Sequence, residues 1–131
     1  MTHGRVVTVL GEVDPDELGF TLSHDHILVD GWGIRQLYEA ILDDEQIALA
    51  ELVRYREAGG RTICDPTNNG LARDPEALAR LSRASGVNIV MGAGWYREMV
   101  YPELITTTST ADLAAMLVRE ITAGVGDTGV R

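Results

Sequence analysis

A regular alternation of short apolar segments with amphipathic helical segments begins at residue 20 and limits the folds open to this chain. Segments typical of strands occupy residues 5–10, 20–29, 62–64 and 87–91. A helical segment follows each of the last three. Strands that alternate with helices, and that are apolar on both faces, favour a parallel sheet. An open doubly wound sheet and a (β/α)8 barrel both satisfy this pattern.

Capping signals delimit the three helical segments. The first is expected to begin at Asp43, the second at Asp74 with Pro75 in its first turn, and the third at Ser109. Each is followed by a glycine, which commonly ends helices. The residues spaced for burial on the inward faces are Leu49, Leu52, Val53, Leu78, Leu81, Leu113, Leu117 and Ile121.

The chain of 131 residues accommodates these three strand–helix units and the start of a fourth strand at Val130. A complete (β/α)8 barrel takes about 250 residues. We therefore expect an α/β chain that forms the N-terminal part of a (β/α)8 TIM barrel, with about three βα units preceded by a short β-hairpin or strand.

Composition narrows the possible partners and location. The net charge is −9 and all 11 basic residues are arginine. An acidic surface repels phosphate backbones and anionic lipids, so we expect neither nucleic acid nor membrane as a partner. No apolar run approaches the ~18 residues of a membrane span. The start of the chain lacks signal-peptide features and Cys64 is the only cysteine, so we expect a cytoplasmic protein.

Two histidines stand out in the segment 20–29. In a strand, His24 and His26 project from one face about 6 to 7 Å apart, while Asp25 points the other way. Two imidazoles on one face can bind a divalent ion. The competing interpretation is a pair of polar residues that hydrogen-bond nearby backbone. Their place in an apolar strand favours the metal site, because unpaired polar groups are costly there.

The segment from Gly19 to Ile27 resembles the first signature of the phosphotriesterase family, within the amidohydrolase superfamily of metal-dependent barrels. That signature usually has Glu where this chain has Asp25. Further segments fit the family in order and spacing, at residues 58–65, 73–74, 87–96 and 119–131. The run from Gly94 through Trp95 and Tyr96 to Pro102 is similar to a phosphotriesterase-related branch.

This resemblance implies that residues 1–131 form the N-terminal portion of a single metal-dependent hydrolase barrel domain. It implies two zinc ions per complete site, with His24 and His26 as ligands of the more buried ion. A carboxylated lysine or a glutamate from the fourth strand would bridge the ions, and the other ligands would come from later strands. The bridging hydroxide would attack a small phosphotriester, lactone or related ester. The resemblance also implies a homodimer for the full-length protein.

Only His24 and His26 have counterparts in this chain, and it contains no lysine. We therefore expect it to be inactive alone. The alternative is a non-catalytic fragment or remnant that associates with a partner half or with itself. A small cofactor-binding module is the third possibility, based on Gly92 and Gly94. Substrate and metal identity stay open at this point.

Weaker candidates surround the histidines. Trp95 and Tyr96 follow the third strand and could line a substrate pocket, or pack over a loop. For Arg97 and Glu98, an exposed ion pair is favoured over contact with the substrate.

Three residues favour structural interpretations. Asp65 is expected to cap the turn that follows its strand rather than to bind a metal. Cys64 is expected to be a core residue rather than a nucleophile. His3 is too far along the chain to count as a ligand.

Overall fold

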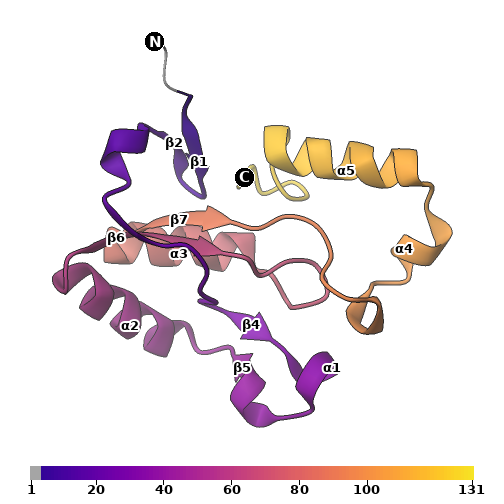
Figure 1. Cartoon of the computed structure of the whole chain (residues 1–131), viewed down its shortest axis with the longest axis horizontal. Coiled ribbons are helices and arrows are strands. Elements are labelled where there is room, and N and C mark those ends of the chain that lie inside the picture. Colours follow the sequence, from indigo (N-terminus) through magenta and orange to yellow (C-terminus); the bar gives the residue numbers. More distant parts are fainter. Residues whose placement is uncertain (1–3) are drawn as a thin grey trace.

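The computed structural model describes residues 4–131. A three-stranded parallel sheet lies at its centre, with strand order β3, β6, β7 (Figure 1). The strands are β3 (Phe20–Leu22), β6 (Gly60–Asp65) and β7 (Asn88–Met91). This arrangement confirms the parallel sheet expected from the alternation of strands and helices.

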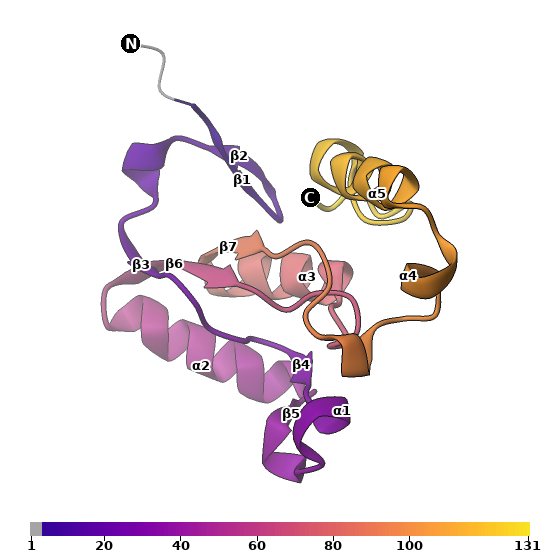
Figure 2. The same cartoon turned by 45° about the vertical axis from the view of Figure 1, so that its right-hand side comes forward.

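One long helix follows each strand of the sheet. These helices are α2 (Glu45–Glu57), α3 (Pro75–Ser85) and α5 (Thr110–Ala123). Helices α2 and α3 lie side by side along one face of the sheet, whereas α5 lies apart from them (Figures 1 and 2). The βα units therefore have the layout of a partial barrel.

The helix starts follow the local capping chemistry. The side chain of Asp74 accepts a hydrogen bond from a backbone N–H of α3, and that of Ser109 does so for α5, so both predicted caps are confirmed. The predicted start of α2 at Asp43 is wrong by one residue. The carboxylate of Asp44 caps this helix instead, because it accepts hydrogen bonds from the N–H groups of Gln46 and Ile47.

A short hairpin precedes the sheet, as expected. It consists of β1 (Val6–Thr8) and β2 (Gly11–Val13), which pair antiparallel, and the single turn η1 (Pro15–Glu17) follows it. The backbone N–H of Val9 donates to the Ile89 carbonyl at 2.9 Å, which joins the hairpin to β7.

The segment between β3 and α2 differs most from the expectation. A single strand over residues 20–29 is wrong, because β3 ends at Leu22. A separate lobe follows, in which β4 (Val29–Asp30) pairs antiparallel with β5 (Ile41–Leu42). Between them lie α1 (Trp32–Arg35) and η2 (Tyr38–Ala40). The sequence pattern did not predict this lobe.

The C-terminal third contains two short turns before α5. They are η3 (Glu98–Val100) and α4 (Leu104–Thr107). The expected fourth strand at Val130 is absent from the described part of the chain. Val130 instead accepts a hydrogen bond from Val125 and packs against the core.

The hydrophobic core lies between the sheet and the helix pair α2 and α3. Its most buried large side chains are Leu78, Val87 and Ile89. Leu52, Leu78 and Leu81 are buried as predicted. Val53 and Ile121 are exposed instead, so their predicted burial is wrong; α5 buries no residue fully in this chain. No helix in residues 4–131 combines the length and apolar character needed to cross a membrane.

Candidate active site

His24 and His26 lie immediately after β3, where the chain leaves the sheet. Their rings are arranged edge to face, with centroids 5.4 Å apart and an interplanar angle of 83°. Both side chains line one cavity, and His26 also lines a second one on the α2 side. The carboxyl ends of parallel strands are where barrel enzymes place their active sites.

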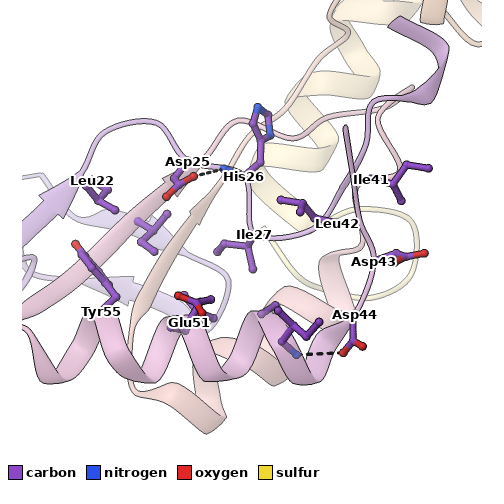
Figure 3. A pocket seen from close by; sticks show the side chains of 14 residues that line it. Leu22, Asp25, His26, Ile27, Ile41, Leu42, Asp43, Asp44, Glu51 and Tyr55 are labelled. Atoms are coloured by element: carbon purple, nitrogen blue, oxygen red, sulfur yellow. Dashed lines mark hydrogen bonds between the residues drawn. The ribbon is translucent and has the colours of Figure 1, made fainter. Parts of the chain in front are cut away.

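Carboxylates accept the backbone hydrogen bonds of the segment that follows β3. The Asp25 N–H still donates to the Cys64 carbonyl of β6 at 3.1 Å. The N–H of His26 instead donates to the Asp25 side chain at 3.0 Å, and that of Ile27 donates to Asp65 Oδ2 at 3.3 Å. Side-chain acceptors thus replace the strand ladder. In Figure 3 the His26 ring extends away from α2, whereas Ile27 points toward α2.

Asp65 and Thr67 support the imidazole of His26. Asp65 is 1% exposed, and its Oδ1 accepts a hydrogen bond from the Thr67 N–H at 2.8 Å. This agrees with the turn-capping role expected from the sequence. The Thr67 hydroxyl lies 2.8 Å from Nδ1 of His26, and Asp65 Oδ1 lies 3.9 Å from the same nitrogen. With Nδ1 engaged, Nε2 is the nitrogen left for a ligand.

Sequence reasoning missed Thr67. The available signal was its position two residues after Asp65, in a turn that follows a strand end.

The pair of imidazoles fits part of a metal site. Two imidazoles that share one ion, each at about 2.1 Å, place their ring centres roughly 5 Å apart, close to the 5.4 Å observed here. A hydrogen bond at the second ring nitrogen is also typical of metal-binding histidines. Within residues 4–131, no group of three or more histidine, cysteine, aspartate or glutamate side chains is arranged to hold an ion. The described chain therefore offers two ligands of such a site.

A cavity of about 350 Å³ opens beside the histidines. Its walls come from the lobe between β4 and β5 and from the loops after β6 and β7. They include the apolar side chains of Val29, Ile34, Leu37, Leu71 and Pro66, and the polar ones of Arg35, Glu39, Tyr96 and Arg97. Three successive strands thus contribute their following loops to one cavity.

Of the aromatic candidates, Tyr96 lines this cavity and is half exposed. Trp95 is partly buried, forms an isolated parallel bridge with Asn69, and is not part of the cavity wall. A substrate-pocket role for either stays a prediction.

The ion pair expected between Arg97 and Glu98 is wrong for the described residues, where no such pair forms. The Arg97 guanidinium instead lies over the ring of Tyr96, 5.0 Å from its centroid.

A second cavity of about 450 Å³ lies on the α2 side of the same segment (Figure 3). Asp25 and Ile27 line it, together with Leu22 and Tyr55. Asp25 does not line the cavity shared by the two histidines, whereas His26 lines both cavities, and no strand runs through residues 24–26. Cys64 is half buried in β6. His3 lies outside the described residues.

Comparisons with known proteins agree on one family. A family model described as "Phosphotriesterase family" matches residues 4–131 of this chain. A phosphotriesterase-related protein of Nematostella vectensis is 30% identical, over 100% of this chain and 47% of its own length. An N-acetyltaurine hydrolase of Salmo salar is 29% identical, over 98% of this chain and 45% of its own. The chain thus spans about half the length of these relatives.

Solved structures agree on the fold. A resiniferatoxin-binding protein from Rhodobacter sphaeroides superimposes with a TM-score of 0.90 at 34% identity, over 98% of this chain and 44% of that one. The lactonase Lmo2620 from Listeria monocytogenes gives a TM-score of 0.89 at 28% identity, over 98% and 45%. The observed sheet and helices therefore have the arrangement found in part of those larger proteins.

Proposed function

Because the chain belongs to the phosphotriesterase family, we propose that it forms the N-terminal, metal-binding portion of a zinc-dependent hydrolase with a dinuclear site. The observation that carries this proposal is the pair His24 and His26. Both rings line a cavity at the carboxyl end of the parallel sheet, and the Nδ1 atom of His26 is already engaged by Thr67.

The residues of this chain would hold and orient one of the ions. His24 and His26 would be its ligands, and the contacts of Thr67 and Asp65 would fix the direction of the His26 ring. Bound metal supplies a hydroxide nucleophile at neutral pH and polarises the substrate. Tyr96 and the apolar wall of the cavity would place the substrate against the histidines.

The proposed substrate is a small ester, which includes phosphotriesters and lactones. The names of relatives support hydrolysis, because one is an N-acetyltaurine hydrolase and another is a lactonase. We also propose a cytoplasmic homodimer for the complete protein. The remaining ligands, including a bridging lysine or glutamate, would come from the portion of the barrel that this chain does not contain.

Metal analysis of the complete protein tests this proposal. We expect about two zinc ions per chain, and His24→Ala and His26→Ala should each reduce zinc content and hydrolysis of an aryl phosphotriester, an aryl ester or a lactone. His3→Ala, which removes the remaining histidine of the chain, is the matched control and should change neither. Full zinc content in His24→Ala and His26→Ala would contradict the proposed ligands.

The alternative is that this portion acts as a non-catalytic fragment. Such a fragment would associate through the outer strand β3, on which Phe20 is exposed. Hydrolysis that requires residues beyond Arg131 would support the first proposal. A stop codon directly after Arg131 would support the fragment.

A further inference from the structure

The cavity beside the histidines has an excess of positive charge. We infer that Arg35 and Arg97 bind the anionic oxyacid group of a small substrate, that is, a carboxylate, sulfonate or phosphate. This inference rests on the proposed function, because it names the substrate class of the same site.

Both arginines line the cavity and both are exposed. Within residues 4–131, no carboxylate oxygen lies within 4.0 Å of either guanidinium. Six other arginines of the chain do have such a partner, namely Arg5, Arg54, Arg73, Arg80, Arg119 and Arg131. The two guanidinium groups at the cavity are therefore available to an external anion.

The charge of the cavity wall differs from that of the whole chain. The chain has 20 acidic and 11 basic residues. The wall has two arginines and one carboxylate, Glu39, which forms no ion pair with either arginine in the described structure. Although the protein is acidic, the wall of this cavity contains two arginines and only one carboxylate. This local charge favours the binding of anions.

The orientation of the Arg97 guanidinium suits hydrogen bonds to an oxyacid group. The Arg97 guanidinium lies over the Tyr96 ring at 5.0 Å, which restricts its orientation and leaves its N–H edge for hydrogen bonds. A planar guanidinium can donate two parallel hydrogen bonds to a carboxylate, sulfonate or phosphate. Arg35 ends α1 and comes from a different loop, so the anion would be held from two elements.

The described part of the cavity is large enough for a small molecule. Its volume of about 350 Å³ lies within the ~300–1,000 Å³ range of small-molecule sites, and the rest of the complete protein would add to its walls. The apolar side chains of Ile34, Leu37 and Leu71 suit a short aliphatic or aromatic body. The expected substrate is therefore a small ester with its anionic group at the arginines and its scissile bond at the histidines.

Two matched esters test the inference in the complete protein. In mono-para-nitrophenyl adipate, a carboxylate replaces the terminal methyl group of para-nitrophenyl hexanoate. We expect Arg97→Gln and Arg35→Gln to lower kcat/KM for the adipate ester by about 10- to 100-fold, mainly through KM. The hexanoate ester should change less than about twofold. Competition by acetate, methanesulfonate and phosphate then shows which oxyacid is preferred.

Controls separate this role from a structural one. Arg83→Gln changes another exposed arginine, which lies at the end of α3 and outside the cavity wall, and should affect neither ester. Arg97→Lys keeps the charge and should recover part of the adipate activity. Equal effects of Arg97→Gln on both esters, or none on the adipate ester, would overturn the inference.

If the unmodified protein hydrolyses neither ester, the proposed function fails on these substrates, and calorimetric binding of adipate decides the anion site independently. Binding that is lost in Arg97→Gln supports the site. Absence of binding, or unchanged binding in Arg97→Gln, overturns it.

Discussion

Thr67 is the residue whose contact most directly orients the proposed metal ligand His26. Its hydroxyl lies 2.8 Å from the Nδ1 atom of the imidazole. When the Nδ1–H group donates to this hydroxyl, the Nε2 atom carries no proton and is available to a ligand.

Replacing Thr67 by Val tests this role. Thr67→Val keeps the shape of the side chain but removes the hydroxyl, so we expect zinc to bind about 10- to 100-fold more weakly. The tautomer ratio of His26, measured by nitrogen NMR without metal, should also shift. Thr106→Val, on the exposed turn α4, is the control. Unchanged zinc affinity and tautomer ratio would show that Thr67 does not orient the ring.

Asp65 joins the turn after β6 to the segment after β3. Its two carboxylate oxygens accept hydrogen bonds from the N–H groups of Thr67 and Ile27, and the residue is 1% exposed. Asp65→Asn replaces one acceptor by an NH2 group that faces a backbone N–H. We expect the free energy of unfolding to fall by about 1–3 kcal/mol, measured by urea denaturation. Asp16→Asn, at an exposed residue of η1, should change it by less than about 0.5 kcal/mol.

At the scale of elements, helices were predicted better than strands. Helix α3 begins at Pro75 after the Asp74 cap and ends before Gly86, as its local signals indicate. The strand predicted over residues 20–29 stops at Leu22. Hydrophobic periodicity could not show that carboxylates would take the N–H groups of His26 and Ile27, because one of those carboxylates, Asp65, comes from a different strand.

An ion pair links the first turn of α2 to α3. Arg80 hydrogen-bonds to Glu45 at 2.6 Å and holds the pKa of that carboxyl below its ordinary value. Because the carboxyl pKa is lower in the folded chain, the pair stabilises it at neutral pH, and this contribution is lost as pH falls through the lowered pKa. Since both groups are exposed, we expect a small effect.

Glu45→Gln should therefore reduce the dependence of stability on pH in the acid range. We expect the variant to be slightly less stable than the parent at pH 7 and to approach it at low pH, measured by denaturation at several pH values. Glu57→Gln, on the same helix and without a partner in the described ion pairs, is the control. A difference between parent and Glu45→Gln that persists at low pH would contradict the pKa argument.

At the scale of the whole molecule, the sheet has two outer strands. Strands β3 and β7 each pair with β6 within the sheet. Phe20 on β3 is 67% exposed, and Val118 and Ile121 on α5 are 60% and 55% exposed. Exposed apolar residues on an outer strand and on a helix favour association with further strands and helices.

We therefore expect the isolated chain to self-associate through α5. Val118→Glu combined with Ile121→Glu should lower the average mass measured by sedimentation or light scattering. Ala115→Glu with Ala123→Glu adds the same charge at exposed positions of that helix and should lower it less. An equal decrease in both double variants would assign the effect to net charge rather than to the apolar face.

Local sequence was sufficient for the three long helices, to within a residue at their starts, and for the parallel βα order. Capping and periodicity involve residues only a few positions apart, so they can be interpreted without the fold. The cavity could not be predicted in this way. Arg35, Thr67 and Arg97 follow three different strands, and only the parallel sheet brings their loops together beside His24 and His26. Tertiary structure decided which polar groups face those imidazoles, because contacts between distant loops depend on strand register rather than on neighbouring residues.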